Sequence, residues 1–351
     1  NLKVESTKIE QEKETSEKSL LENNMATGEY KALADIGSSL FFVLQSFSVI
    51  DTMYQFSLKF YIKLIHLMLS KEPRLASIPG SQFEARRTLL HTLIFEFVIN
   101  KTLSFIKEED KLILILKFAE LHVEKNVSKE IAGYLKHLYV SSNVVESSTS
   151  LSSLTKDFEE HHLISIEILS KLPHFEKFLD SFKKNINEWK GYLQHQAKNV
   201  DLEFLKNSEL LASKSEEHQS LMIQIGQLVV SRYFNSKEFV DGCLGLVNGL
   251  FKRQILNEWQ LSISNIVNED TDSKVPILLA CAQGFDPTFK IRDVAHASNV
   301  RLEDIAIGSK ESYEQASSII ENGVKKGTWV LLKNVHLSVS WLKNFELKYY
   351  Q

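Results

Sequence analysis

Cysteine is scarce in this sequence, with only Cys243 and Cys281 among its 351 residues. The two do not form a Cys-x-x-Cys pair, so neither a disulfide framework nor a cysteine-rich zinc site is available. This usage fits a reducing compartment, and we expect a cytoplasmic protein.

Features of secretion and membrane insertion are also missing. The first residues, Asn-Leu-Lys-Val-Glu, are not a basic region followed by an apolar one, and no apolar run approaches the roughly 20 residues of a membrane span. The net charge is -4 and the pI is near 6.3, so charge gives no reason to expect nucleic acid or an anionic membrane as the main partner. With 43% hydrophobic and 25% charged residues, we expect a globular chain of two or three domains.

The first part of the chain is polar. Lys, Glu, Ser and Thr dominate residues 1–30, and a thin apolar stripe runs through good helix formers. This pattern predicts a charged helical arm over residues 1–35, exposed or in a coiled coil. A frayed, solvated terminus is the alternative.

Dense apolar residues at helical spacing follow, and they predict an all-helical domain over residues 36–145. Two buried helices are expected between Ile36 and Leu69, with Asp51 or Thr52 as the N-cap of the second. The runs "RRTLLHTLIFEFVINKTLSFI" and "EEDKLILILKFAELHV" predict further helices.

A Ser-rich stretch then predicts a linker over residues 146–156. Helical patterns resume in a lead-in over residues 157–265. We expect one helix to end before Pro173 and a single amphipathic helix to run from Phe175 to Leu193.

The pattern changes in residues 275–351. The apolar runs "VPILLACA" (275–282), "RLEDIAIG" and "TWVLLKNV" predict strands, and helices are expected after Asp286 and in "ESYEQASSIIENGVKKG". This alternation predicts a parallel sheet. Three strands leave open edges, so we expect the domain to continue beyond Gln351. The predicted fold is mainly α with a C-terminal α/β part.

The turn after the first predicted strand lacks the phosphate loop of P-loop ATPases. That loop reads Gly-x-x-x-x-Gly-Lys-Ser/Thr, and its backbone N–H groups bind phosphate. Here the corresponding positions are Gly284, Asp286 and Thr288. We expect Asp286 to cap the next helix, which places a carboxylate where phosphate would bind. Lys290, a turn into that helix, is the remaining candidate phosphate contact.

The third predicted strand ends in Lys333 and Asn334. In many P-loop ATPases such a strand ends in two acidic residues, which hold magnesium and the attacking water. We therefore predict no catalytic, cofactor-binding or metal-binding residues in this segment. His161 and His162 are adjacent in a predicted helix, so we expect their side chains to point apart rather than form a metal pair.

Three segments, in this order along the chain, resemble the cytoplasmic dynein heavy-chain family. "SSLFFVLQSFSVIDTMYQFSLKFYIKLI" is similar to the part after the fifth AAA+ module's large domain, and "EILSKLPHFEKFLDSF" to the part leading into the sixth module. "DIAIGSKESYEQASSIIENGVKKGTWVLLKNVHLSVSWLKNFE" looks like the sixth module itself. A composition rich in Lys, Asn and Ile suits a fungal member.

The resemblance implies a piece of an ATP-driven, minus-end-directed microtubule motor of the cytoplasm and cytoskeleton. Residues 1–35 would end the fifth module and brace the stalk, residues 36–145 would be its helical lid, and residues 157–351 an incomplete large domain of the sixth, an αβα sheet domain. In the family these modules are structural, and ATP and magnesium bind elsewhere in the parent motor. The implied partners are the other AAA+ modules, microtubules through the stalk, and, for the parent homodimer, accessory chains.

An alternative from a different class remains open. The chain could be a self-contained helical scaffold or interaction protein with a degenerate ATPase-like domain. A ring segment should expose apolar interfaces and associate when isolated, whereas an independent scaffold should be monomeric with a two-state melt.

Overall fold

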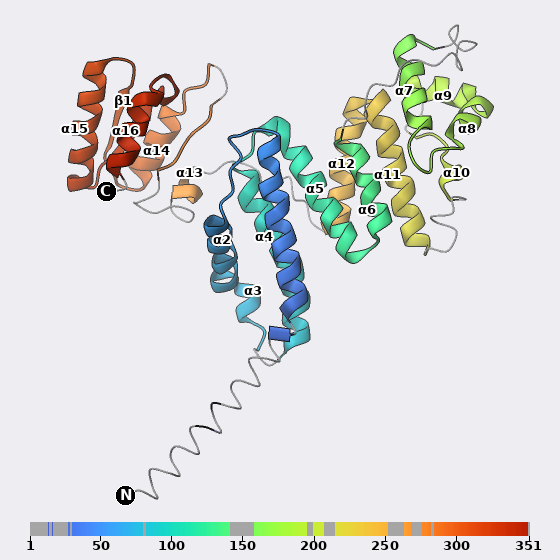
Figure 1. The fold of residues 1–351 in the computed structure, drawn as a ribbon, viewed down its shortest axis with the longest axis horizontal. Helices are drawn as coiled ribbons and strands as arrows, with labels where there is room; N and C mark the ends of the chain where they lie inside the picture. Colours follow the sequence, from blue (N-terminus) through green and yellow to red (C-terminus); the bar gives the residue numbers. More distant parts are fainter. Residues whose placement is uncertain are drawn as a thin grey trace, which may run out of the picture. The chain divides into compact units, whose positions relative to one another are not determined.

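The computed structural model describes residues 30–79, 82–140, 158–194, 199–206, 215–251, 263–267, 276–281 and 284–349, with Lys13, Ser16, Thr27 and Gly28. The chain divides into two compact units, Asn1–Gln260 (unit 1) and Leu261–Gln351 (unit 2) (Figure 1). Most of the predicted arm and all of the predicted linker at 146–156 lie outside the described residues.

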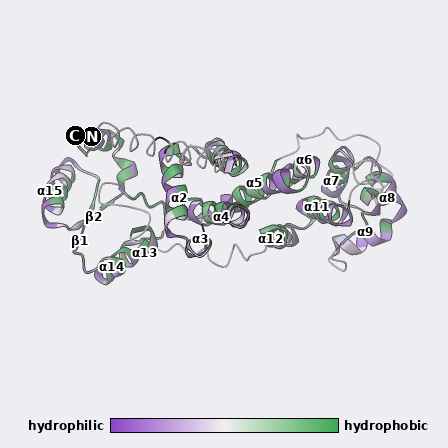
Figure 2. Cartoon of the chain, turned by 90° about the horizontal axis from the view of Figure 1, so that it is seen from below, coloured by the Kyte–Doolittle hydropathy of each residue, from purple (hydrophilic) through white to green (hydrophobic). Residues whose placement is uncertain are grey.

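The described part of unit 1 is helical. Its first half contains a helix over residues 30–46, η1 (Phe47–Val49), α2 (Leu58–Lys71), α3 (Pro73–Ala76), α4 (Phe83–Leu103), α5 (Glu108–Asn126), α6 (Lys129–Leu135) and η2 (Lys136–Leu138). Helical spacing of apolar residues therefore predicted this half correctly. Figure 2 shows the reason, since hydrophobic and hydrophilic residues alternate around the helices.

The predicted cap of α2 is wrong. Ser57, not Asp51 or Thr52, occupies the N-cap, and its side chain accepts a hydrogen bond from the backbone N–H of Phe60. Asp51 instead accepts from the backbone N–H of Met53, at 2.9 Å, in a local turn. An Asp before an apolar run can accept a hydrogen bond within a turn as readily as it can cap a helix. Here Asp51 forms the turn, and Ser57 caps the helix.

The second half of unit 1 contains α7 (Glu160–Ser170), α8 (Phe178–Lys184), α9 (Ile186–Leu193), α10 (Glu203–Lys206), α11 (Glu216–Phe234) and α12 (Ser236–Phe251). The single helix expected from Phe175 to Leu193 is wrong, because Asn185, with φ -115° and ψ 35°, ends α8 and begins α9. The break lets Phe178, Phe182 and Trp189 pack together as buried rings. Contacts between these rings favour the break between α8 and α9.

One hydrophobic core joins the two halves of unit 1, from Ile36 to Phe251. Polar contacts cross between the halves as well: Arg232 of α11 donates to the backbone oxygens of His137 and Val140 at the end of η2, and the Tyr134 hydroxyl donates to the backbone oxygen of Pro173. The predicted lid and lead-in are therefore packed as one body in this structure.

The expectation that no apolar stretch reaches membrane-spanning length is also wrong. Among the described residues, the segment Tyr30–Val49 is long and apolar enough by composition, with a mean hydropathy of 1.4. Its buried side chains, Ile36, Leu40, Leu44 and Phe47, form one stripe at helical spacing within the core. A helix that packs in a protein core along such a stripe can meet the same criteria of length and composition as a membrane-spanning helix.

Unit 2 contains α13 (Ile263–Asn265), α14 (Thr288–Ala297), β1 (Leu302–Ala306), α15 (Lys310–Lys326), β2 (Trp329–Lys333), η5 (Val335–Leu337) and α16 (Val339–Tyr349). β1 and β2 pair in parallel, with Leu302 opposite Trp329 and Ala306 opposite Lys333. α14 and α15 lie on opposite sides of the two strands (Figures 1 and 2). The parallel pairing of strands predicted for this part is confirmed for β1 and β2.

The first predicted strand, over residues 275–282, is wrong in its described part. Residues 276–281 have no regular structure, and Leu278 is 72% exposed. The sheet of the described residues has only β1 and β2. An apolar run becomes a strand only where a neighbouring strand supplies hydrogen-bond partners, and no strand among the described residues pairs with this run.

Candidate functional site

The turn before α14 holds the residues expected at the phosphate-loop position. One carboxylate oxygen of Asp286 accepts from the backbone N–H of Thr288, at 2.9 Å, and also from the Thr288 hydroxyl. These bonds hold the Asp286 pKa below its ordinary value, assisted by the charges of Lys333 and Arg292. Asp286 is therefore ionised at neutral pH at the start of the helix, where an anionic ligand would otherwise bind.

The other half of the site lies on the two strands. Lys333, the last residue of β2, places its ammonium nitrogen 2.8 Å from one carboxylate oxygen of Asp304 on β1. Arg292 of α14 binds the other oxygen of Asp304 at 3.2 Å. The hydrogen bond from Lys333 is the main reason why the Asp304 pKa lies below its ordinary value.

These four side chains, Asp286, Arg292, Asp304 and Lys333, form an electrically balanced group that we call the charge cluster. Two carboxylates and two cations alternate, and each carboxylate is already engaged by hydrogen bonds. Magnesium is bound by oxygen ligands, and phosphate is bound by N–H donors at a helix N-terminus. In this structure a magnesium ion or a phosphate at this position would compete with the contacts that these side chains already make.

The sequence identified only part of this cluster. Asp286 was expected to cap α14, but Pro287 occupies the N-cap position and Asp286, one residue earlier, accepts hydrogen bonds from Thr288. Lys333 lies within electrostatic reach of Asp286. Gly284 and Asn334 adopt left-handed backbone conformations, at φ 82° and 60°. Gly284 lies in the turn before α14, and Asn334 lies in the turn directly after β2.

Asp304 and Arg292 were missed by the sequence analysis. A carboxylate inside an apolar strand pattern was the available signal for Asp304, since such a group needs a partner. Lys290, the remaining candidate phosphate contact, lies over the ring of Phe285 at 5.3 Å.

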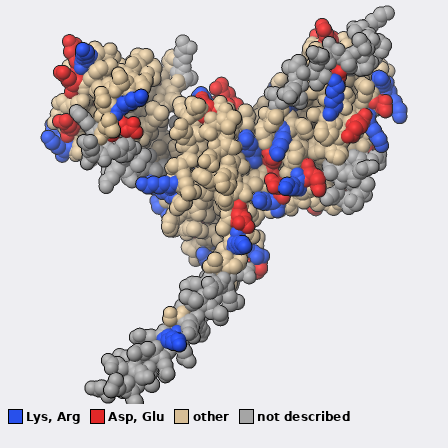
Figure 3. All heavy atoms as spheres, in the orientation of Figure 1, with Lys and Arg blue, Asp and Glu red and all other residues tan. Residues whose placement is uncertain are grey.

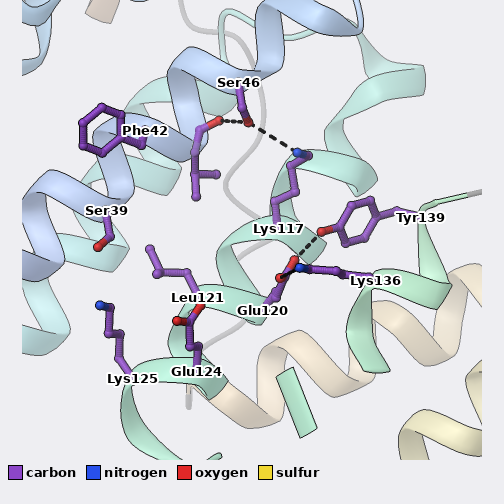
Figure 4. A pocket seen from close by; sticks show the side chains of 11 residues that line it. Ser39, Phe42, Ser46, Lys117, Glu120, Leu121, Glu124, Lys125, Lys136 and Tyr139 are labelled. Atoms are coloured by element: carbon purple, nitrogen blue, oxygen red, sulfur yellow. Dashed lines mark hydrogen bonds and ion pairs between the residues drawn. The ribbon is translucent and has the colours of Figure 1, made fainter. Parts of the chain in front are cut away.

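Unit 1 contains a separate groove of about 420 Å³ between the 30–46 helix and α5 (Figure 4). Five of its polar side chains contact one another, namely Ser46, Lys117, Glu120, Lys136 and Tyr139 in two separate groups. Glu120 accepts from the Tyr139 hydroxyl and pairs with Lys136 at 3.5 Å, and Lys117 donates to the Ser46 hydroxyl at 3.3 Å. Burial, with Glu120 beside it, raises the Tyr139 pKa, so the phenol stays protonated and is no general base at neutral pH.

Histidine and acidic side chains do not assemble a metal site in the part of the chain that the structure describes: no group of three such residues could hold an ion. His161 and His162 do not point apart as expected, because their ring centroids are 3.9 Å apart. Rotation about the side-chain bonds brings neighbouring rings together here, which the positions along the helix alone do not predict.

Comparison with known proteins finds one family model and several proteins that are similar to this chain. Residues 272–351 match the family described as "Dynein heavy chain region D6 P-loop domain". A cytoplasmic dynein heavy chain of Paramecium tetraurelia is 29% identical over 100% of this chain and 8% of its own length. Those of Dictyostelium discoideum and Drosophila melanogaster are 27% and 26% identical, each over 99% of this chain and 7% of the relative.

The chain thus spans less than a tenth of the length of these relatives, but the similarity extends along nearly all of it. The three resembling segments lie in both halves of unit 1 and in unit 2. The resemblance seen in the sequence is confirmed, since the chain is similar to cytoplasmic dynein heavy chains along nearly its whole length.

Proposed function

We propose that this chain is a structural, non-hydrolysing part of the AAA+ ring of a cytoplasmic dynein heavy chain, a minus-end-directed microtubule motor driven by ATP. The charge cluster carries the proposal. By their positions in the sequence pattern, Lys333 would replace a magnesium-binding carboxylate and Asp286 would occupy the phosphate position, and the contacts of Lys333 with Asp304 and of Asp286 with Thr288 support this reading. The segment would need neither ATP nor magnesium, which the parent motor would bind in other modules.

The proposed role is mechanical. Residues 36–145 would serve as the helical lid of the fifth module, residues 157–351 as the large domain of the sixth, and residues 1–35 as an arm bracing the stalk. The continuous core of unit 1 supports this role, because conformational changes pass between sites through packed elements. Its partners would be the other AAA+ modules and, through the parent's stalk, microtubules; the parent would be a cytoplasmic, cytoskeletal homodimer with accessory chains.

Calorimetric titration with ATP and ADP in the presence of magnesium tests the nucleotide part of the proposal. We expect no saturable heat at millimolar nucleotide, because ligand phosphate would have to displace an ionised Asp286. Saturable binding that is lost in Lys290→Ala would contradict the proposal, since it would reveal a phosphate site on the exposed side of α14.

Deletion of residues 1–30 in a whole motor tests the bracing role. We expect the ATPase rate to become independent of microtubule binding, because the stalk would lose its support. Unchanged coupling between the two activities would remove this part of the proposal and leave the nucleotide result unaffected.

A further inference from the structure

Helix α14 packs on the rest of unit 2 along one narrow stripe. Its buried side chains are Thr288, Ile291 and Ala295, spaced three and four residues apart. Phe289, next to this stripe, is 75% exposed, and the three-residue α13 adds a further contact. A helix that buries few side chains can roll or tilt about its stripe at low cost. Contacts beside the stripe are therefore needed to fix its orientation.

The two ends of α14 are attached differently. At the C-terminal end, residues 298–301 lead directly into β1, and the backbone N–H of Val300 donates to the backbone oxygen of Ala295, at 2.9 Å. At the N-terminal end, the hydrogen bonds of Asp286 go to Thr288 in the same turn. They shape the turn without attaching it to the strands. The N-terminal half of the helix is thus the part whose position depends on other contacts.

Asp304 of β1 supplies such a contact. One of its carboxylate oxygens binds Arg292 of α14 at 3.2 Å, and the other binds Lys333 of β2 at 2.8 Å, so a single side chain joins one helix and two strands. Arg292 directly follows Ile291 of the buried stripe. The ion pair therefore lies beside the stripe, where it opposes a roll of the helix.

Opposite charges alone do not distinguish this contact. Acidic and basic side chains lie next to each other at more than one place on unit 2 (Figure 3). The pair of Arg301 and Glu303, at 3.2 Å, joins residues that are two apart in the sequence. Asp304 differs because its partners come from separate elements, and a contact of that kind can hold one element against another.

Asp286 completes the charge cluster. Two cations around the carboxylate of Asp304 leave one positive charge in excess, close to the N-terminus of α14, which is itself positive. The charge of Asp286 balances this excess, since it interacts with both Lys333 and Arg292 through space. A single exposed ion pair contributes little, whereas several charges in one network contribute more.

We propose that the charge cluster is a lock, a set of contacts that fixes α14 on β1 and β2 without a bound ligand. In P-loop ATPases the helix after the first strand receives phosphate at its N-terminus, and segments held by phosphate can move when the nucleotide changes. The inference rests on the proposed function, since a lock suits a module that passes on conformational changes and does not start them.

Electron paramagnetic resonance of two spin labels on the 351-residue chain measures the lock. The labels are attached at Phe289→Cys on α14 and Ser318→Cys on α15, which are exposed positions, in a Cys281→Ser background. Cys243 is buried and should stay unlabelled. α15 contacts both strands and serves as the reference. We expect a narrow distribution of distances, unchanged by magnesium and ATP.

Charge-removing variants connect this distribution to the cluster. Asp304→Asn should broaden it about twofold, because α14 is then free to roll about its stripe. Glu303→Gln is the matched control: it removes a carboxylate from the same strand, on the opposite face, and should leave the width unchanged.

Arg292→Leu tests the same contact from the helix, since it keeps an aliphatic side chain and removes the charge. It should broaden the distribution as Asp304→Asn does, and the double variant should be no broader than either single variant. If Asp304→Asn does not fold, as judged by circular dichroism, Arg292→Leu decides, because its site is exposed.

Three results would overturn the lock: widths that stay as in the wild type in both variants, broadening that adds up in the double variant, or a wild-type distribution that shifts with magnesium and ATP. The proposed function fails separately. Saturable nucleotide binding in calorimetry, with an unchanged distance distribution, would contradict the absence of a nucleotide site and leave the lock in place.

Discussion

At the scale of single residues, the ion pair between Lys333 and Asp304 makes the stability of unit 2 depend on pH. The Asp304 pKa is lower in the folded chain than in the unfolded chain. The unfolded state therefore binds more protons around pH 4, and the stabilisation is present above the unfolded pKa of about 3.9 and lost as pH falls through the folded pKa. We expect Asp304→Asn to flatten the pH dependence of unit 2 in this acidic range.

Fluorine NMR of the chain labelled with 5-fluorotryptophan measures this effect, because Trp329 and Trp341 report on unit 2. Urea titrations between pH 3 and pH 7 give the free energy of unfolding. Asp293→Asn, on an exposed position of the same α14 that supplies Arg292, is the matched control. An unchanged slope in Asp304→Asn would mean that the ion pair is too well solvated to contribute.

His122 of α5 makes unit 1 sensitive to acid at a higher pH. Its ring contacts Phe251 and Phe95, with centroids 4.8 Å and 5.2 Å away. Burial lowers its pKa to about 4, assisted by His91. Since the unfolded value is about 6.5, the unfolded state binds more protons between these limits, and stability falls as pH decreases from about 6.5 to 4.

We expect His122→Phe to keep the ring contacts and remove this pH dependence. Wild type should lose about 2 kcal/mol between pH 6.5 and 4, after allowance for solvent screening, and the variant should lose less. Urea unfolding followed by circular dichroism at 222 nm measures the difference. Identical slopes for the two proteins would show that the ring is protonated without cost in the folded state.

At the scale of secondary-structure elements, Gly323 shows where close packing outweighs helix propensity. A Cβ atom at Gly323 in α15 would lie 2.9 Å from the side chain of Val330 and 3.1 Å from the backbone oxygen of Thr328. Val330 belongs to β2 and Thr328 to the turn before it, so neither can move freely. Glycine here lets α15 lie directly on β2.

We expect Gly323→Ala to destabilise unit 2 by about 1–2 kcal/mol, because overpacking exceeds the gain in helix propensity. Gly245→Ala in α12 is the comparison, since a Cβ there meets nothing within 4 Å. That substitution should stabilise unit 1 by about 0.5–1 kcal/mol. Thermal melts of both variants measure the two effects, and stabilisation by both would refute the packing argument.

Element prediction succeeded where local chemistry decided the structure. The apolar runs of α4 and α5 and the run "ESYEQASSIIENGVKKG" of α15 predicted helices, and the structure contains them. Element prediction failed where contacts with residues distant in the sequence determine the structure. The run at 276–281 is apolar enough for a strand but pairs with no strand among the described residues. Asn185 separates α8 from α9, and aromatic rings of both helices pack together.

The same reasoning applies to the charge cluster. Asp286 and Lys333 could be selected because each departs from a motif of fixed spacing. Asp304 and Arg292 could not, because nothing local connects a strand carboxylate to a helix guanidinium. Only the parallel register, with Ala306 opposite Lys333, brings Asp304 within reach of both cations.

At the scale of the whole molecule, unit 1 combines the predicted lid and lead-in in one core, although the sequence suggests a linker between them. Contacts between α5 and α12, and between α6 and α11, join the two halves. Arg232 of α11 also donates hydrogen bonds to the backbone oxygens of His137 and Val140, at the end of η2. A core shared in this way should unfold as a single cooperative body.

Hydrogen exchange followed by mass spectrometry tests this cooperativity. Ile99 is fully buried in α4, and Ile99→Val should cost about 0.5–1.5 kcal/mol. If unit 1 opens as one body, the amides that exchange most slowly in α11 should speed up by the same factor as those in α4, although α11 is far along the chain. Ile291→Val, in α14 of unit 2, is the matched control and should leave α11 unchanged. Acceleration confined to α4 and its neighbours would show that the halves open separately, and the continuous core could then not carry a conformational change from one half to the other.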